Sequence, residues 1–490
     1  MLELLTPQQM AEADRRTVTA GTPIATLMDE AGHAVANLVA SHHAFGAHVV
    51  VLAGPGDNGG DAYVAARVLD ERGYRVRVVP LGAPPADSAA GRARLAYRGP
   101  LVECCGADFG PADAVVDGLF GGGLSRPLDG DAAALVAAAH AARARGAKIY
   151  AIDLPSGVDG ATGALSGPAV VADRTITFAR RRVGHLLLPG RTHCGAVSVA
   201  QIGIADATIA AVAGQTFANE PALWRDLRPQ RADGANKYTS GHAVVVSGPM
   251  AATGAARLAA RAALRAGAGL VTLASAPDAL MVNACHLTTV MLAKIAGPDE
   301  LSAFLTDRRL NTVCLGPGLP PDERTRALCL AALSSGAAVV LDAGAISAWA
   351  DQPNDLFSAV NGKNAVLTPH EGEFARVFGR SDGDKLTRTR SAAAQCGAVV
   401  VLKGADTVIA SPNGRAAINA NAPPWLATAG TGDVLSGIVT AFLAQGAPPF
   451  EAAAMGVWLH GDAAHRSGPA LIAEDLVEAV RPAMVAFNAL

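Results

Sequence analysis

The sequence lacks the long apolar runs that membrane proteins need. No stretch of its 490 residues reaches the roughly 18 apolar residues that span a bilayer as a helix. The N-terminal segment also lacks a basic flank followed by an apolar region, which is the pattern of a secretory signal. We therefore expect a cytoplasmic protein with no membrane partner.

Basic charge is also scarce. The formal net charge is -3, and only 17% of the residues are charged. Arginine clusters such as Arg180, Arg181 and Arg182 are too short to form a track for a phosphate backbone. We therefore expect no nucleic acid among the partners.

The cysteines do not form a recognisable framework. There are seven, an odd number, and none falls in a C-x-x-C spacing. Cys104 and Cys105 are adjacent and cannot easily bridge each other. The sequence predicts reduced thiols rather than disulfides or a cysteine metal site.

The length and the composition favour two globular domains. Half of the residues are hydrophobic, and the chain suits two cores of about 200 to 250 residues each better than one. In the first half, short β-branched runs alternate with alanine-rich helical stretches, which predicts a parallel, doubly wound sheet. The runs are HVVVLAG (48–54), RVRVVPLG (75–82), DAVVDGLFG (113–121), KIYAIDLPSG (148–157) and RTITFA (174–179).

The same alternation restarts at HAVVVSG (242–248). It continues through LVTLAS, TVCLGPG, AVVLDAG, NAVLTPH and AVVVLKGAD. The stretch 219–238 between the two halves is charged, contains proline and is weakly periodic, so we expect a linker there. The sequence thus predicts an α/β protein with two doubly wound parallel-sheet domains, at residues 1–219 and 220–490.

Ligands of such sheets bind beyond the carboxyl ends of the strands. GPGDNGGDAYVAARVL (54–69) follows one strand and opens a helix. It superficially matches a dinucleotide fingerprint, but Asp57 and Asp61 lie within it, and carboxylates are poor neighbours for a pyrophosphate. The alternative interpretation is a tight turn capped by Asp61.

Two further strand ends, VVDGLFGGGLSRPLDG (115–130) and AIDLPSGVDGATG (151–163), carry similar polar and glycine-rich stretches. Together, the three stretches resemble the signature of the NAD(P)HX epimerase family, which has a Rossmann-like fold. The resemblance extends from LLTPQQMAEADRRT (4–17) through TITFARRRVGHLLLPG (175–190). Judged without the family, an aspartate in the position of Asp153 is more often a strand-end turn residue or a helix cap than an acid/base.

The resemblance implies a potassium ion and an acid/base residue. Asn58, Asp117 and Ser156 would hold K⁺, and Asp153 would move the proton. Oxygen ligands suit a weakly held monovalent cation, and exchanging epimers at a hydrated ring carbon requires proton transfer. The substrate-binding residues implied by the family are Asp57, Asn58, Gly59, Gly60, Asp61, Gly121, Gly122, Gly123, Leu124, Ser125, Arg126, Pro127 and Asp153.

This half departs from the family pattern at three positions. The family usually has Asn-Asn-Gly-Gly-Asp-Gly where this chain has Asp57 and Ala62, and often a lysine where Arg182 stands. We interpret these changes as adjustments of residues at the rim of the site.

ATAGTGDVLSGIV (427–439) places Asp433 inside a glycine loop that otherwise suits anions. This stretch, with LGPGLP, VLDAGAIS, LTPHEGEFARVF and VVLKGADTVIASPNG, resembles the ribokinase-like NAD(P)HX dehydratase domain. The resemblance implies that Asp433 is the general base, that ADP donates the phosphoryl group, and that Mg²⁺ binds together with ADP. Ala255, Gly318, His370 and Asp433 would face the hydrated dinucleotide, and Lys403, Gly404, Ala405, Asp406, Thr407 and Gly432 would bind the nucleotide. In this half, Pro320 and Gly344 replace a usual glycine and a common acidic residue.

Several alternatives remain open from the residues alone. Asp433 could act only as the N-cap of the following helix. His370, Glu371 and Glu373 could form a metal site, although H-E-x-E lacks the histidine pair of H-E-x-x-H. The second half could be a small-molecule kinase, and the first a non-catalytic nucleotide-binding module. The expectation overall is a homo-oligomeric, bifunctional repair enzyme that epimerises R- and S-NAD(P)HX and dehydrates the S form, converting ADP to AMP and phosphate.

Overall fold

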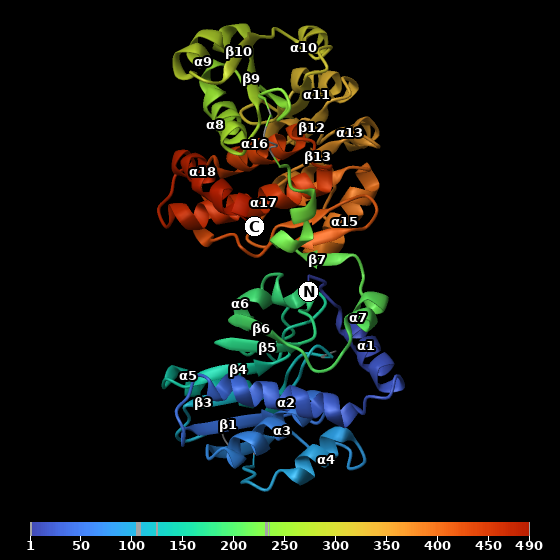
Figure 1. The fold of residues 1–490 in the computed structure, drawn as a ribbon, viewed down its shortest axis with the longest axis vertical. Coiled ribbons are helices and arrows are strands. Elements are labelled where there is room, and N and C mark those ends of the chain that lie inside the picture. The colour runs from blue at the N-terminus through green and yellow to red at the C-terminus, as the bar shows by residue number, and fades with distance from the viewer. Residues whose placement is uncertain (1, 104–108, 124–125, 231–233, 235, 490) are drawn as a thin grey trace. The chain divides into compact units, whose positions relative to one another are not determined.

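The computed structural model describes residues 2–103, 109–123, 126–230, 234 and 236–489. Cys104, Cys105, Leu124 and Ser125 lie outside these ranges. The chain divides into two compact units, which are essentially Glu3–Thr216 and Phe217–Leu490. Each unit has its own sheet with helices packed on it (Figure 1). Among the described residues, no helix is long and apolar enough to cross a membrane.

The first unit is built on a parallel sheet of six strands. The five strands that the sequence predicts are confirmed, and β6 is added at one edge. In spatial order the strands are β2 (Arg75–Pro80), β1 (His48–Ala53), β3 (Ala114–Gly118), β4 (Lys148–Ile152), β5 (Arg174–Phe178) and β6 (Ala196–Ala200). The helices are α1 (Pro7–Thr19), α2 (Ile24–Ala40), α3 (Asp57–Glu71), α4 (Ala89–Ala96), α5 (Gly130–Ala144), α6 (Gly190–Cys194) and α7 (Asp206–Val212).

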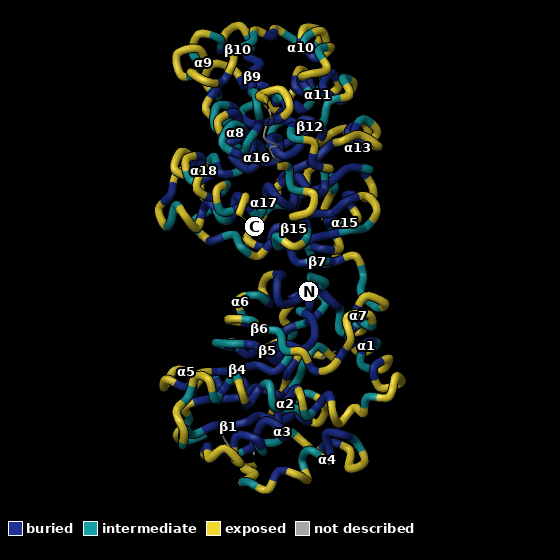
Figure 2. Tube along the Cα trace, in the orientation of Figure 1, coloured by how far each residue is buried: buried dark blue, intermediate teal, exposed yellow. Residues whose placement is uncertain are grey.

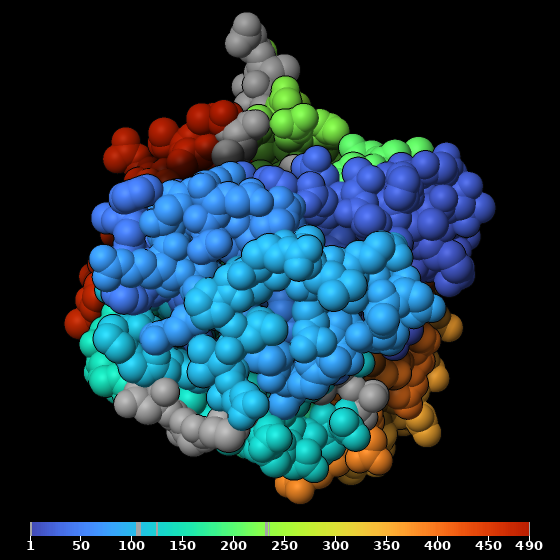
Figure 3. Space-filling model, turned by 90° about the horizontal axis from the view of Figure 1, so that it is seen from below, coloured from blue at the N-terminus to red at the C-terminus, as the bar shows by residue number. Residues whose placement is uncertain are grey.

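The central strands of this sheet, such as β1 and β3, are buried on both faces (Figure 2), whereas the edge strand β6 is partly exposed. Along β1, Val49 and Val51 pack in the cluster of α2 and α3, whereas Val50 and Leu52 pack in the cluster of α5. Successive side chains of a strand point to opposite faces, so a continuous apolar run serves a sheet with helices on both sides. Helix α4 packs on α3, and the segment that contains α4 forms much of the light blue surface in Figure 3.

The second unit contains a mixed sheet of ten strands. All neighbours from β10 to β14 are parallel, but β14, β15 and β16 pair antiparallel. The predicted parallel sheet is thus confirmed from β10 to β14, and the remaining edge is antiparallel because a turn as short as 403–407 can only join antiparallel strands. In spatial order the strands are β10 (Met291–Lys294), β9 (Leu270–Ser275), β8 (His242–Val246), β11 (Leu310–Leu315), β12 (Ala338–Leu341), β13 (Ala365–Leu367), β14 (Val399–Leu402), β15 (Val408–Ala410), β16 (Ala416–Ile418) and β7 (Thr216–Ala218).

Eleven α-helices are described in the second unit. Those labelled α8, α16, α17 and α18 pack on one another and bury the largest apolar cluster. The helices are α8 (Thr253–Arg265), α9 (Leu280–His286), α10 (Pro298–Phe304), α11 (Glu323–Ser334), α12 (Ala343–Ser347), α13 (Pro353–Val360), α14 (Glu371–Val377), α15 (Lys385–Cys396), α16 (Thr431–Ala444), α17 (Pro449–Ser467) and α18 (Ala473–Ala489).

The stretch 219–238, expected to be a linker, is partly packed in the second unit. Trp224 is 1% exposed, and its ring stacks on Phe487 with the centroids 4.9 Å apart. The indole nitrogen of Trp224 donates a hydrogen bond to Asn219 Oδ1 over 3.1 Å. This part of the stretch therefore anchors to the second core rather than hanging free between two domains.

Candidate functional site

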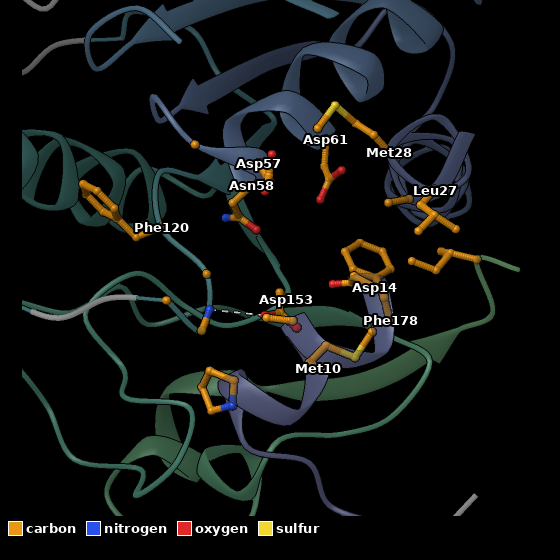
Figure 4. A pocket seen from close by; sticks show the side chains of 18 of the residues that line it. Met10, Asp14, Leu27, Met28, Asp57, Asn58, Asp61, Phe120, Asp153 and Phe178 are labelled. Carbon is orange, nitrogen blue, oxygen red and sulfur yellow. Dashed lines mark hydrogen bonds between the residues drawn. The ribbon is translucent and has the colours of Figure 1, made fainter. Parts of the chain in front are cut away.

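A cavity of about 450 Å³ opens at the carboxyl ends of the first sheet. It lies beside β1 and β3, where the strand order 2-1-3 reverses direction, which is where doubly wound sheets bind ligands. One part of its lining is apolar and the other is rich in carboxylates (Figure 4). Its polar and glycine lining comprises Asp14, Gly56, Asp57, Asn58, Asp61, Gly121, Gly122, Gly123, Asp153 and Arg182.

Helix α3, which follows β1, carries three of these side chains. Helix α3 begins at Asp57 with Gly56 as N-cap, and no side chain caps it, so Asp61 is not the cap. Asp57, Asn58 and Asp61 line the cavity, whereas Gly59 and Gly60 are buried in the first turn of α3. A Cβ on Gly59 would lie 1.9 Å from the backbone oxygen of Gly54. Gly59 therefore allows the loop to close tightly, and its neighbours point into the cavity.

Asp153 follows β4 and has a left-handed backbone conformation, with φ of 58°. Its Oδ1 accepts a hydrogen bond from Thr177 Oγ1 over 2.8 Å and lies 3.0 Å from Arg182 Nη2. Its Oδ2 accepts a hydrogen bond from the backbone N–H of Gly122 over 3.2 Å. Burial opposes ionisation, but Arg182 and these donors hold the pKa of Asp153 below its usual range. Asp153 is thus a fixed, ionised carboxylate facing the cavity.

His185 holds the backbone of Asp153 in place. Its Nδ1 accepts a hydrogen bond from the backbone N–H of Arg182 over 2.8 Å, and Nε2 lies 2.7 Å from the backbone oxygen of Asp153. Burial lowers the pKa of His185 to about 4. A neutral ring that accepts at Nδ1 donates from Nε2, so His185 holds the backbone of Asp153 in its strained conformation.

Asp117 and Ser156 meet beneath this cavity. Ser156 Oγ donates to Asp117 Oδ1 over 2.7 Å, and its backbone N–H donates to Oδ2 over 2.8 Å. Ser156 Oγ also lies 3.1 Å from the backbone oxygen of Phe120. Burial raises the pKa of Asp117 to about 6, although the Ser156 hydrogen bonds oppose that rise. Asn58 lines the cavity nearby, and its buried Nδ2 has no hydrogen-bond partner in the described structure.

The glycine-rich segment after β3 is only partly in the cavity wall. Gly121, Gly122 and Gly123 line it, and a Cβ on Gly121 would lie 3.1 Å from Asn58 Oδ1 and 3.3 Å from Asp153 Oδ2. Bare backbone therefore faces both side chains. Arg126 and Pro127 are exposed and lie outside the lining, and Leu124 and Ser125 are not described.

Asp433 lies in the first turn of α16 in the second unit. That helix begins at Thr431 with Gly430 as N-cap, and no side chain caps it. The cap-only interpretation of Asp433 is therefore wrong. Burial raises the pKa of Asp433 to about 6, Asp342 and Glu373 add to the rise, and Lys403 opposes it. A carboxylate with this pKa can take up a proton near neutral pH.

Lys403 stands at the centre of this site. Its Nζ lies 2.6 Å from Asp342 Oδ1 and 3.9 Å from Glu373 Oε2. Ser436 Oγ donates to Asp342 Oδ2 over 2.6 Å, so both oxygens of Asp342 are engaged. A Cβ on Gly432 would lie 3.5 Å from Lys403 Nζ, which places the ammonium beside the first turn of α16. The structure thus brings Lys403, Gly432 and Asp433 together.

The other residues of the expected nucleotide set form the turn after β14. Thr407 Oγ1 donates to the backbone oxygen of Gly404 over 2.7 Å and closes this turn. Asp406 Oδ1 lies 2.8 Å from Nζ of Lys385, and both side chains are largely buried. Gly404 and Ala405 are exposed at the tip of the turn.

His370 is exposed and acts as the N-cap of α14. Its Nδ1 accepts hydrogen bonds from the backbone N–H groups of Gly372 and Glu373, and Glu373 Oε2 accepts one from the backbone N–H of His370 over 2.9 Å. Glu371 is paired with Arg388 at 2.9 Å. No group of three histidine, cysteine or acidic residues in the described ranges could hold a metal ion. These separate pairings do not support the alternative metal site at H-E-x-E.

Ala255 and Gly318 meet where the second sheet reverses its strand order, between β8 and β11. A Cβ on Gly318 would lie 3.5 Å from Ala255 Cβ. A cavity of about 260 Å³ adjoins them, lined by residues that include Ser247, Leu319 and Pro320. This placement again follows the switch-point rule for open parallel sheets.

Several residues of the two sites were not predicted from the sequence. Asp14, Thr177 and His185 surround Asp153, and Asp342 and Ser436 hold Lys403. Of these residues, only Asp342 could have been proposed as a site residue from the sequence, because it directly follows an apolar strand. The others lie on helices or within strands, where sequence alone does not distinguish them from structural polar residues.

Comparisons with known proteins agree across both halves. A family model described as NAD(P)H-hydrate dehydratase matches residues 243–477, and one described as YjeF-related protein N-terminus matches residues 24–184. The bifunctional NAD(P)H-hydrate repair enzyme of Moorella thermoacetica is 35% identical over 97% of this chain and 95% of its own length. The bifunctional repair enzyme of Mycobacterium tuberculosis is 39% identical over 84% of this chain and 81% of its own.

Among solved structures, an ADP/ATP-dependent NAD(P)H-hydrate dehydratase from Bacillus subtilis, co-crystallised with ATP and Mg²⁺, aligns with 55% of this chain and 98% of its own. Its sequence identity is 28% and its TM-score is 0.48. The relatives that cover both halves at more than 30% identity carry the assignment. The chain belongs to the family of bifunctional NAD(P)H-hydrate repair enzymes.

Proposed function

We propose that residues 1–219 epimerise R- and S-NADHX and R- and S-NADPHX, and that residues 220–490 dehydrate the S epimers at the expense of ADP. The single observation that supports this division best is the position of Asp433. It is a carboxylate of raised pKa in the first turn of α16, beside Lys403, in a loop that would otherwise attract only anions. A base beside an anion-binding loop suits transfer of a phosphoryl group to a hydroxyl.

The dehydration would proceed in two steps. In the first, the ring hydroxyl gives its proton to Asp433 and attacks the terminal phosphorus of ADP, and AMP departs with the bridging oxygen. In the second, the C–O bond to the new phosphate breaks, a proton leaves the neighbouring carbon, and the dihydronicotinamide double bond forms. Phosphorylation thus converts a poor leaving group into a good one.

Lys403 and the turn from Gly404 to Thr407 would hold the nucleotide. The ammonium lies beside Gly432, where backbone N–H groups of α16 face outward. Mg²⁺ usually needs only one or two carboxylates in addition to phosphate oxygens. Glu373 lies 3.9 Å from Lys403 and fits that role. Mg²⁺ would supply charge neutralisation on the phosphates when bound.

Asp153 would be the acid/base of the epimerase, held by Thr177, Arg182 and His185. Asn58, Asp117 and Ser156 would hold K⁺, since they offer amide, carboxylate and hydroxyl oxygens, and Asp117 is buried without a cationic partner among the described ion pairs. K⁺ would supply a positive charge beneath the cavity. Asp57 to Asp61 and Gly121 to Pro127 would bind the hydrated dinucleotide. The enzyme would act as a homo-oligomer in the cytoplasm on small molecules, without nucleic acid.

One experiment tests the whole proposal. Purified protein is incubated with mixed NADHX or NADPHX epimers and either ADP or ATP, and the absorbance of reduced nicotinamide is followed. Complete conversion with release of inorganic phosphate is the expected result. A stable phosphoester would indicate a kinase instead, and conversion of the S fraction alone would indicate a first half without epimerase activity.

A further inference from the structure

The epimerase cavity contains a carboxyl group to which the proposed function gives no role. Asp14, on α1, lines the cavity together with Asp61 and Asp153. Its carboxyl group makes no hydrogen bond or ion pair with the described residues, whereas Asp153 accepts from three donors. A partly buried carboxyl group facing a ligand cavity without a partner requires an explanation.

The position of Asp14 follows from the geometry of α1. Thr6 caps this helix through a capping box with Gln9, and Pro7 occupies its first turn. Met10 and Asp14 are four residues apart, so they share one face of α1, and both line the cavity. The start of α1 is therefore well defined, and it directs Asp14 inward.

Asp14 belongs to the end of the cavity that suits a flat ring. Figure 4 shows Asp14, Asp153, Met10 and Phe178 on one side of the cavity, and Asp57, Asn58 and Asp61 on the other. Met10 and Phe178 offer apolar surface to a nicotinamide ring. A ring bound against them would have Asp14 and Asp153 as its nearest carboxyl groups, with Asp61 across the cavity on α3.

The two carboxyl groups have opposite tendencies to ionise. Burial raises the pKa of Asp14 to about 6, with Arg182 opposing and with Asp153 and Asp57 adding to the rise. The charged groups facing Asp14 are Asp57 and Asp61 on α3, Asp153 after β4, and Arg182 before the 3₁₀ turn Val183–His185. Asp153 has a lowered pKa. Neighbouring carboxyl groups whose pKa values diverge are typical of an acid and a base that act together.

Inverting a carbon that carries a hydroxyl group requires two proton transfers. One bond to that carbon must break and form again on the other face. The departing hydroxyl needs a proton to leave as water, and the arriving water must lose one. A single carboxylate in one place serves only one of these transfers well.

We propose that Asp14 is the proton donor of the epimerase and works with Asp153 as the acceptor. This assignment rests on the proposed function of the first half. Asp14 gives its proton to the ring hydroxyl, the C–O bond breaks with its electron pair on oxygen, and water leaves a ring cation. A solvent water then forms the new C–O bond on the opposite face and gives its proton to Asp153. One water leaves and one enters, and proton exchange with solvent restores both carboxyl groups.

The test compares Asp14→Asn with the wild-type protein in epimerisation and dehydration. Loss of a general acid typically lowers the rate by at least about 100-fold. We expect that loss in kcat for epimerisation, with KM within about 3-fold and dehydration of pure S epimer unchanged. Glu12→Gln is the matched control, since Glu12 lies on the same helix, pairs with Arg16 at 2.6 Å and is absent from the cavity lining. This control should leave epimerisation unchanged.

The pH profile provides a readout that a structural role would not change. A donor with a pKa of about 6 must be protonated, so wild-type epimerisation should fall about tenfold per pH unit above that value. Asp14→Asn should lose this decline. Asp14→Glu keeps a carboxylic acid, so it should retain a decline at a shifted pH and regain at least a tenth of the rate.

Two outcomes overturn the assignment. One is an Asp14→Asn variant that keeps more than a tenth of the activity and the same decline. The other is disappearance of the decline in Asp61→Asn but not in Asp14→Asn. Asp153→Asn separates these from failure of the proposed function, because an Asp153→Asn variant with full epimerisation would refute the site itself. If Asp14→Asn does not fold, Asp14→Glu still tests the assignment. Its epimerisation rate should decline at a different pH from the wild-type rate, and an unchanged pH would overturn the assignment.

Discussion

The Nζ of Lys403 lies 2.6 Å from Asp342 Oδ1, and Ser436 Oγ lies 2.6 Å from the other oxygen of the same carboxylate. Asp342 follows β12, Lys403 follows β14, and Ser436 is one turn beyond Gly432 on α16. Three segments distant in sequence are thus joined at one carboxylate. Burial raises the pKa of the nearby Asp433, the charge of Asp342 adds to that rise, and Lys403 opposes it.

Asp342→Asn should destabilise the second unit. Asp342 is 1% exposed, and the change would leave Lys403 without its closest anion. Breaking a buried pair typically costs about 3 to 5 kcal/mol, and the partial exposure of Lys403 points to the lower end. The free energy of unfolding is measured by denaturant titration. The matched control is Asp307→Asn, since Asp307 pairs with Arg309 at 2.7 Å on the surface and exposed pairs contribute little to stability. Equal costs for both variants would contradict the role of Asp342.

Asp433→Asn should abolish dehydration without loss of stability. Removing a general base typically lowers the rate about 100-fold to 10,000-fold, and epimerisation should be untouched. Wild-type dehydration should also decline as the pH falls below about 6, because the base becomes protonated. The turnover of pure S epimer by both proteins, measured from about pH 5 to pH 8 at constant ionic strength, gives the loss of rate and its pH dependence. A variant that keeps more than about a tenth of the wild-type rate would refute the role of Asp433.

The same substitution should raise stability at neutral pH. The folded-state pKa of Asp433 is raised from 3.8 to about 6, so the folded protein binds this proton more tightly than the unfolded chain does. Ionisation in the folded state therefore costs stability as the pH rises through this interval, and the cost is full above it. Asp433→Asn removes the cost. The melting temperature of the variant should exceed that of the wild-type protein at pH 7.5, and the difference should shrink towards pH 4. A lower melting temperature at pH 7.5 would contradict this account.

Arg182→Met should move the acidic limb of epimerisation to higher pH. Arg182 Nη2 lies 3.0 Å from Asp153 Oδ1 and is the chief group that lowers the pKa of Asp153. Without that charge, Asp153 would become protonated at a higher pH and cease to accept a proton. Arg182→Lys keeps the charge and should retain the wild-type profile. The pH dependence of kcat/KM for epimerisation distinguishes the two variants, and identical profiles would rule out this role of Arg182.

Replacing K⁺ by tetramethylammonium should slow epimerisation and spare dehydration of pure S epimer. Asn58, Asp117 and Ser156 offer oxygen ligands in the first unit only. A bulky organic cation cannot fit among these oxygen atoms. The total salt concentration is held constant, so that electrostatic screening does not change. Ser156→Ala should reduce the response to K⁺. Equal loss of both activities, or of neither, would argue against the site.

Local sequence was sufficient for the central strands of each sheet and for the stretches that follow them. Runs such as 48–54 and 338–344 are short, β-branched and apolar, and the structure confirms strands there. Strands β15 and β16 were not predicted, because three-residue strands with alanine carry little pattern. The alternative with Asp433 as the N-cap placed that cap three residues too late, since Gly430 is the N-cap of α16 and no side chain caps this helix.

The sequence by itself determined the α/β class, the two-part organisation and the family, because these depend on periodicity and on motifs contiguous in the chain. It also identified Asp153 and Asp433 as candidate catalytic residues. Only the tertiary structure decided how each carboxyl group behaves. Asp153 lies beside Arg182 and has a lowered pKa, whereas Asp14 and Asp433 are partly buried near other carboxylates and have raised ones. Ionisation depends on burial and on charges that approach through space, and the residues supplying those charges are far apart in the chain.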